Sequence, residues 1–322
     1  MIAAPFYADL AEGPDGGRAI WLQAADGVRI RAGFWGGGPN GTILLVPGKG
    51  EYIEKYGRVA ANLGAGGWSL VTLDLRGQGL SDRLLPDSML GHVGCFADYQ
   101  LDLEALCGWM SNEGGDTGIR GPLMMIAHSM GGLIGLRALY RAPEIRAVFF
   151  VSPMWGILLP TGAHYLAELL SRINHPVAGD NDYAPTQTSE DYLLGTDFKD
   201  NILTSDPEAW EFMRQQKMVE PRFQLGGPSL GWLRAALREA RLMAREPAPD
   251  VRAKVALGSR EAVVDPEAVR LRLKDWPRAV LDLYPDARHE LMMEVPATRT
   301  RLIRDMLKFF DEAAGDDVRS EG

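Results

Sequence analysis

Cysteine is scarce in this chain, since only Cys95 and Cys107 occur among its 322 residues. One pair cannot make a disulfide framework, so we expect reduced, packed thiols of the kind found in cytoplasmic proteins. Runs of lysine and arginine are also missing, and the formal charge is -9, from 43 acidic and 34 basic residues. Because nucleic acid is bound by concentrated positive charge, it is excluded as a partner.

Long apolar segments are missing as well. No stretch approaches the roughly 20 uncharged apolar residues that cross a bilayer. Residues 1–18 contain Asp9, Glu12 and Asp15 and lack the hydrophobic middle of a signal peptide. No group of histidines and cysteines has the spacing of metal ligands. We therefore expect a cytoplasmic protein without a transmembrane segment, metal or other cofactor.

Buried strands alternate with helices over much of the chain. Apolar runs predict strands at 42–47, 69–73, 123–127, 147–151, 254–258 and 279–284. Helical spacing of apolar residues occurs at 53–63, 96–110, 129–141 and 297–312. Near the N-terminus, Asp26-Gly27 predicts a hairpin turn between two further strands. This alternation is typical of an α/β fold, with a mostly parallel sheet covered by helices on both faces.

The alternation stops between Pro153 and Pro249, where helical stretches without strands are expected at 162–173, 207–218 and 230–244. The sheet pattern then resumes, so this segment reads as an insertion between two strands. We therefore divide the chain into a core of residues 1–152 and 250–314, a helical insertion of residues 153–249, and a flexible tail of residues 315–322.

Ser129 lies between the predicted strand at 123–127 and the helix that follows it. The surrounding residues approach the pattern Gly-x-Ser-x-Gly, with Ala127 in place of the first glycine. Such a turn lifts the serine hydroxyl above the sheet and aims the amide of Met130 at the reacting centre. A serine that only caps the helix is the alternative. The position after the third buried strand favours a nucleophile. Because the residue at this turn is serine, hydrolases that use an aspartate nucleophile there are disfavoured.

A serine nucleophile needs a base, and in this kind of fold the base comes last in the chain. His289 follows the last predicted strand and precedes the C-terminal helix, so it is the candidate base. The other histidines are expected to have structural or surface roles: His128, packed beside the serine but pointing away from it, and His92, His164 and His175.

Two carboxylates follow the strand at 254–258 and are candidates for the acid that orients the base. Asp265 precedes a proline and a helical stretch, which a helix N-cap explains. Glu261 has no such explanation and is favoured. The glycine-rich turn after the strand at 42–47 is expected to supply a second oxyanion donor, the amide of Lys49. The charged residues beside it, Glu51, Glu54 and Lys55, are interpreted as a solvated helix start.

Five segments together resemble the lysophospholipase and monoacylglycerol lipase branch of the α/β-hydrolases, and most closely the bacterial lysophospholipase L2-like proteins. They are Leu45-Val46-Pro47-Gly48-Lys49-Gly50-Glu51, Asp74-Leu75-Arg76-Gly77-Gln78-Gly79-Leu80-Ser81-Asp82, His128-Ser129-Met130-Gly131-Gly132, Gly258-Ser259-Arg260-Glu261 and Ala287-Arg288-His289-Glu290-Leu291. The resemblance covers most of the chain outside the insertion. This chain departs from many relatives at Pro47, where they have histidine, and at Glu261, where they have aspartate.

The resemblance implies a serine hydrolase that cleaves lipid esters, with Ser129 as nucleophile, His289 as base and Glu261 as acid. It implies the amides of Lys49 and Met130 as the oxyanion hole. The insertion would be a cap that shapes acyl-chain binding and leaves peripheral contact with a membrane open. Residues that enter it are candidates for that role or for plain core packing: Met154, Trp155, Ile157, Leu158 and Leu159. An esterase for small esters, a thioesterase, an acyltransferase or a peptidase would use the same residues, and a binding protein on a former hydrolase scaffold is a further alternative.

Overall fold

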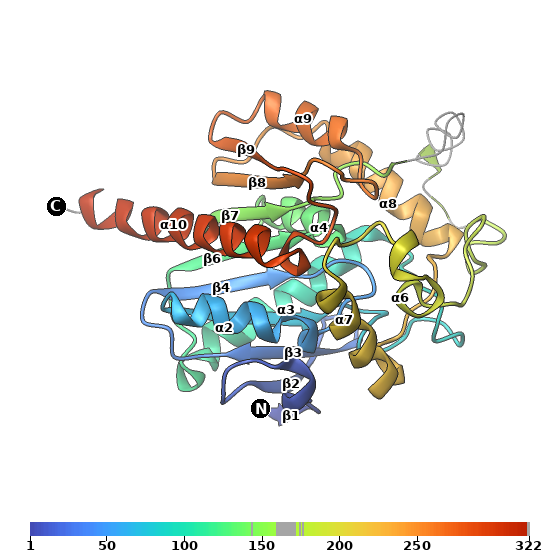
Figure 1. The fold of residues 1–322 in the computed structure, drawn as a ribbon, viewed down its shortest axis with the longest axis horizontal. Helices are drawn as coiled ribbons and strands as arrows, with labels where there is room; N and C mark the ends of the chain where they lie inside the picture. The colour runs from blue at the N-terminus through green and yellow to red at the C-terminus, as the bar shows by residue number, and fades with distance from the viewer. Residues whose placement is uncertain (143, 159–171, 174, 176, 321–322) are drawn as a thin grey trace.

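A mostly parallel sheet forms the centre of the computed structural model, which describes residues 1–142, 144–158, 172–173, 175 and 177–320. Within these residues the strand order is β1-β2-β3-β5-β4-β6-β7-β8-β9 (Figure 1). The pairs β1-β2, β2-β3 and β3-β5 are antiparallel, and the pairs from β5 onward are parallel. The strands are β1 (Ile2–Ala3), β2 (Arg18–Gln23), β3 (Arg29–Trp35), β4 (Gly41–Val46), β5 (Trp68–Asp74), β6 (Leu123–His128), β7 (Ile145–Val151), β8 (Arg252–Gly258) and β9 (Ala279–Tyr284).

The central strands read as continuous apolar runs because both of their faces are covered. Side chains alternate between the two faces, as the period of a strand requires. In β4, Leu44 and Val46 join a hydrophobic cluster that includes residues of α3 and α4. Ile43 and Leu45 join a second cluster that includes residues of α2 and α10. The predicted strands are confirmed, including the hairpin β2-β3, whereas the short β1 was not predicted.

Helices cover both faces of the sheet, with α2 and α10 on one and α3 and α4 on the other (Figure 1). The helices of the core are α1 (Ala8–Ala11), α2 (Gly57–Ala65), α3 (Tyr99–Asn112), α4 (Met130–Ala138), α9 (Pro266–Lys274) and α10 (Pro296–Ser320). Short 3-10 helices are η1 (Ile53–Tyr56), η2 (Phe96–Asp98), η3 (Gly114–Thr117) and η6 (Leu291–Met293). The last helix continues to Ser320, past its predicted end at residue 312.

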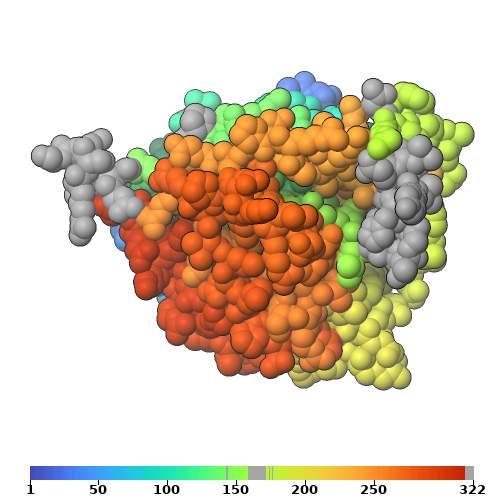
Figure 2. Space-filling model, turned by 90° about the horizontal axis from the view of Figure 1, so that it is seen from above, coloured from blue at the N-terminus to red at the C-terminus, as the bar shows by residue number. Residues whose placement is uncertain are grey.

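The insertion leaves the sheet after β7 and returns to it at β8. Its described helices are α6 (Tyr192–Gly195), η4 (Phe198–Asp200), α7 (Pro207–Val219), η5 (Pro221–Phe223) and α8 (Leu230–Met243). Those predicted at 207–218 and 230–244 are confirmed, and the stretch predicted at 162–173 lies largely outside the described residues. α7 packs against η1, which follows β4, and α8 packs against α4, which follows β6. The insertion therefore lies over the carboxyl ends of the central strands (Figure 1). The space-filling view shows it beside the C-terminal part of the chain (Figure 2).

Candidate active site

Ser129 occupies the sharp turn between β6 and α4. Its backbone has φ 49° and ψ -119°, a strained conformation for a residue with a side chain. Behind the turn, a Cβ atom at Gly131 would lie 2.2 Å from the carbonyl oxygen of Val46. A Cβ atom at Gly132 would lie 2.5 Å from the Cβ atom of Pro153. Only glycine fits at these two positions, which explains the pair of glycines after the serine.

A hydrogen-bonded chain runs from Ser129 through His289 to Glu261. The Ser129 hydroxyl lies 2.9 Å from Nε2 of His289, and Nδ1 lies 2.9 and 3.0 Å from the two carboxylate oxygens of Glu261. An ionised carboxylate only accepts hydrogen bonds, so Nδ1 carries the proton and Nε2 accepts from the hydroxyl. This is the tautomer that can take the proton of an attacking serine.

The structure brings Glu261, not Asp265, to the histidine. The amides of Val263 and Val264 donate to Oε1 of Glu261 at 2.7 and 3.1 Å. Burial alone would raise the pKa of Glu261, but the His289 ring and these two amides lower it below its usual value. Asp265 accepts a hydrogen bond from an amide in the first turn of α9, the N-cap that its position before proline predicted.

The loop after β4 is held on both sides of Lys49. Oε1 of Gln78 accepts a hydrogen bond of 3.0 Å from the amide of Gly50. Nε2 of Gln78 donates to the carbonyl oxygens of Gly48 at 2.8 Å and of Glu51 at 3.1 Å. The Glu51 carboxylate accepts from the Gly48 amide. Among the described residues none accepts a hydrogen bond from the amide of Lys49, so this donor between the clamped groups is free.

A second free amide belongs to Met130, the first residue of α4. It likewise has no acceptor within the described part of the chain, and it lies at the positive end of the helix. The Lys49 loop lies against the serine, because a Cβ atom at Gly48 would be 3.1 Å from the Cβ atom of Ser129. Both amides predicted to form the oxyanion hole therefore lie beside the Ser129 turn, and neither has an acceptor among the described residues; their role in binding a developing negative charge stays a prediction.

Known proteins resemble this chain in sequence and in fold. The family model Hydrolase_4, described as serine aminopeptidase, S33, matches residues 37–296. The chain belongs to this family. Lysophospholipase L2 of Escherichia coli strain K12 is 27% identical over 285 residues, which cover 84% of this chain and 80% of the relative. The probable lysophospholipase L2 of Haemophilus influenzae is 24% identical over 286 residues, 84% of this chain and 83% of the relative.

Among solved structures, a soluble variant of monoglyceride lipase from Saccharomyces cerevisiae in complex with a substrate analog is similar, with a TM-score of 0.71 and 23% identity. The match covers 96% of this chain and 99% of that chain. A thermostable carboxyl esterase from Bacillus coagulans has the same TM-score of 0.71 at 14% identity. These likenesses confirm the predicted α/β-hydrolase fold.

Next to the Ser129 turn, this member of the S33 family contains a buried cluster of charges. Nζ of Lys55 lies 2.6 Å from the carboxylate of Glu51 and 2.8 Å from that of Glu290. Nε2 of His128 lies 3.3 Å from both carboxylates, and its Nδ1 lies 3.1 Å from the carbonyl oxygen of Val151. Burial would lower the pKa of His128, but the two carboxylates raise it to about 10. An imidazolium and an ammonium therefore balance two carboxylates.

Distances alone would also suit a metal ion here, since ligand atoms of Glu51, His128 and Glu290 lie within 4.8 Å of one another. The chemistry of the donor set does not fit. The Lys55 ammonium already bridges both carboxylates, and a protonated Nε2 has no lone pair to offer a metal. The group is an ion cluster that supports the loop and the turn on either side of the site.

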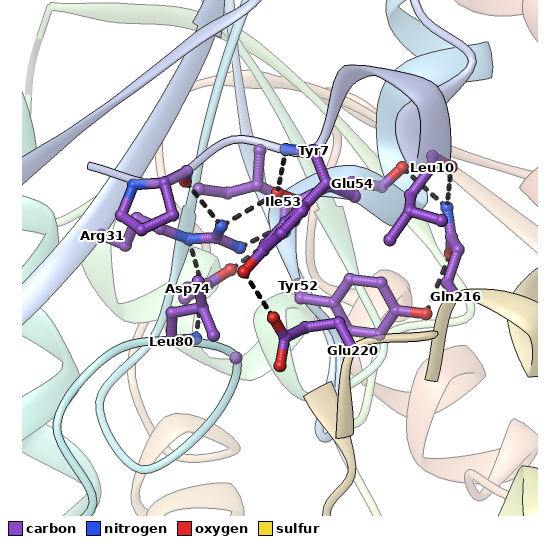
Figure 3. Close-up of polar contacts among 12 residues, drawn as sticks. Tyr7, Leu10, Arg31, Tyr52, Ile53, Glu54, Asp74, Leu80, Gln216 and Glu220 are labelled. Carbon is purple, nitrogen blue, oxygen red and sulfur yellow. Dashed lines mark hydrogen bonds and ion pairs between the residues drawn. The ribbon is translucent and has the colours of Figure 1, made fainter. Parts of the chain in front are cut away.

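The interpretation of Glu51, Glu54 and Lys55 as a solvated helix start is wrong, because they are 5%, 0% and 4% exposed. Glu51 and Lys55 pair with each other within this segment. The other partners, Glu290 for Lys55 and Arg31 for Glu54, come from distant segments, which the local sequence does not reveal. Arg31 donates to both carboxylate oxygens of Glu54, at 2.9 and 2.7 Å, and to Asp74 at 2.8 Å (Figure 3). Buried charges of this kind persist only when each is paired and hydrogen-bonded.

The same network reaches the insertion. Gln216 of α7 donates to the carbonyl oxygens of Leu10 at 2.6 Å and of Glu54 at 3.1 Å (Figure 3). The Tyr52 hydroxyl donates to Oε1 of Gln216 at 2.9 Å. The N-terminal segment, the loop that carries Lys49 and the insertion are therefore joined by buried hydrogen bonds. None of these contacts was predicted from the sequence.

The residues that enter the insertion divide between two roles. Met154 and Trp155 are buried in the hydrophobic cluster that contains α3 and α4, and Nε1 of Trp155 donates to the carbonyl oxygen of Gly132 at 3.0 Å. They pack the core. Ile157 is partly buried against the same cluster, whereas Leu158 is 49% exposed. Leu159 lies outside the described residues.

Two of the remaining histidines, His92 and His175, are described, and both lie beside α8. Nδ1 of His92 is 2.8 Å from the hydroxyl of Ser229, which caps α8. His175 lines a surface cavity beside α8, and His164 lies outside the described residues. In the described part of the chain, no helix has the length and apolar content that crossing a membrane requires.

Proposed function

We propose that this S33-family member is a serine hydrolase that cleaves carboxylic esters of lipids, with a lysophospholipid or monoacylglycerol as substrate. The single observation that carries the proposal is the chain of hydrogen bonds from Ser129 to His289 to Glu261. The E. coli and H. influenzae relatives named lysophospholipase L2 and the yeast monoglyceride lipase support the lipid class.

The reaction follows from the positions of the groups. His289 takes the Ser129 proton at Nε2 as the hydroxyl oxygen attacks the ester carbonyl, and Glu261 stabilises the imidazolium that forms. The amides of Lys49 and Met130 bind the negative oxygen of the tetrahedral intermediate. His289 then gives the proton to the alcohol oxygen as its bond to the carbonyl carbon breaks, so the alcohol leaves and the fatty acyl group stays esterified to Ser129. A water molecule, activated by His289, releases the fatty acid in the same way.

The test is fatty acid release from lysophosphatidylcholine and from monoacylglycerol by the purified protein and two variants. Ser129→Ala is expected to lower turnover by roughly 10⁴-fold or more. Ser111→Ala, a change of the same kind at an exposed position on α3, serves as the control and keeps full turnover. Labelling by a serine-directed fluorophosphonate should disappear only in Ser129→Ala. Full turnover by Ser129→Ala would overturn the proposal.

A further inference from the structure

A cavity of about 370 Å³ lies between the Lys49 loop and the insertion. The core contributes residues 49–52, Lys55 and Glu290, and most of the insertion's share comes from residues 186–196, Lys217 and 225–228. Polar residues make up much of the wall, among them Thr186, Gln187 and Thr188. Such a lining suits a polar group better than an acyl chain.

Three lysines line this cavity, and two of them are neutralised. Lys55 bridges the carboxylates of the buried ion cluster. Nζ of Lys217 lies 2.6 Å from the carboxylate of Asp191, a buried pair. Nζ of Lys49 donates only to the carbonyl oxygen of Gly226, at 2.9 Å, and no carboxylate of the described residues pairs with it. Of the three lysines, Lys49 is therefore the one without a carboxylate partner among the described residues; Glu190, an exposed acid, also lines the cavity.

An unpaired ammonium in such a place is unfavourable without a ligand. Burial, together with the nearby Lys217, lowers the pKa of Lys49 to about 7. An anion in the cavity would remove this penalty by supplying the missing counterion and a charge-assisted hydrogen bond. Among groups that a lipid ester carries next to its acylated glycerol, phosphate has this chemistry, whereas the free hydroxyls of a monoacylglycerol do not.

We propose that the cavity is a head-group subsite and that the Lys49 ammonium binds the phosphate of a lysophospholipid. This inference rests on the proposed function. Lys49 then has two separate contacts with one substrate. Its backbone amide faces the ester carbonyl at Ser129, and its side chain lies in the cavity where the glycerol phosphate is held. The side chain therefore selects phosphate-bearing esters over neutral esters of the same acyl chain.

The experiment compares kcat/KM for lysophosphatidylglycerol and monoacylglycerol with identical acyl chains. The ratio of the two values is expected to fall about tenfold or more in Lys49→Met and to recover in Lys49→Arg, which keeps the charge. Taking a ratio cancels any effect of the substitution on the oxyanion amide. Lys199→Met, at an exposed position on η4, is the matched control and should leave the ratio unchanged. An unchanged ratio in Lys49→Met would overturn the proposal.

Binding without turnover separates this proposal from the proposed function. Glycerol 3-phosphate is titrated calorimetrically into Ser129→Ala and into the double variant with Lys49→Met. Saturable binding to the first, weakened about tenfold in the second, supports the subsite even for an enzyme that hydrolyses neither lipid. Equal binding by both variants, or inorganic phosphate binding as tightly as glycerol 3-phosphate, would overturn the assignment to a lipid head group.

Discussion

Replacing Gln78 by leucine removes the clamp on the Lys49 loop while keeping a buried side chain of similar size. Gln78 is 2% exposed, and its amide group makes three hydrogen bonds to the loop, at 3.0, 2.8 and 3.1 Å. The loop residues that it holds, Gly48, Gly50 and Glu51, surround the free amide of Lys49. Gln78 touches no reacting atom, so it is a positioning residue.

The expected effect is on the transition state. Each backbone group left buried without a partner costs about 1–3 kcal/mol, so the loop of Gln78→Leu is expected to move toward water. Displacing one oxyanion donor costs roughly 10²–10³ in kcat, and we expect Gln78→Leu to approach the lower of these values. KM should change little, because the ground-state carbonyl depends less on this donor than the tetrahedral intermediate does.

The assay measures kcat and KM for a short p-nitrophenyl ester, and the inhibition constant of an alkyl boronic acid. A boronate bound to Ser129 is tetrahedral and charged, so its inhibition constant should rise by the same factor as kcat/KM falls. Gln23→Leu, which loses an exposed hydrogen bond to the carbonyl of Gly27, is the control. A folded Gln78→Leu enzyme with kcat within about twofold of the parent would refute the reasoning.

Two pairs of substitutions and one change of pH test other parts of the structure. Glu261→Gln should lower kcat by roughly 10³–10⁴. Asp265→Ala should instead lower the free energy of unfolding by about 1 kcal/mol and leave kcat intact. Kinetics and urea denaturation that show the reverse pattern would exchange the roles of the two residues. Arg31→Met leaves two buried carboxylates without their ion-pair partner and should lower the free energy of unfolding by about 3–5 kcal/mol. Arg29→Met, at an exposed ion pair, should lower it by less than about 1 kcal/mol. Equal losses would contradict the network in Figure 3. The pKa of Lys49 is about 7, so its ammonium is present below that pH and lost above it, and the preference for lysophosphatidylglycerol over monoacylglycerol should fall from pH 6 to pH 8. A flat ratio over that range would contradict the phosphate contact.

That last prediction depends on which charges face the titrating group. Lys217 and Asp191 are the charged neighbours that shift the pKa of Lys49, and they are paired with each other. The phosphodiester of the substrate does not titrate in this range. Any pH dependence of the chemical step at Ser129 is shared by both lipids, so it cancels in the ratio. The remaining change with pH therefore reports the Lys49 ammonium.

Local sequence was sufficient for the sheet and for the turn that carries the serine. Apolar runs bounded by turn residues predict buried strands because both faces of a parallel sheet are covered. The pair of glycines after Ser129 reflects a close approach of backbone that any side chain would block. Asp265 before proline predicted an N-cap, since that function depends only on the neighbouring residues. Short segments of sequence show all of these features, although the two glycines owe theirs to contacts with Val46 and Pro153 elsewhere in the chain.

Contacts between distant segments were decided only by the tertiary structure. By local sequence Glu54 resembles a solvated helix residue, but in the structure Arg31 of β3 pairs with it. Gln78 and His128 stand in family-like segments, yet their partners lie in other loops, at residues 48–51 and at Glu290. Burial converts such polar side chains from neutral surface groups into obligatory pairs, because an unpaired charge or amide loses its hydration there. Packing decides which chain segment supplies the partner of a buried charge. It also decides which lysine of the cavity has no carboxylate beside it, and periodicity and spacing in the sequence do not encode this.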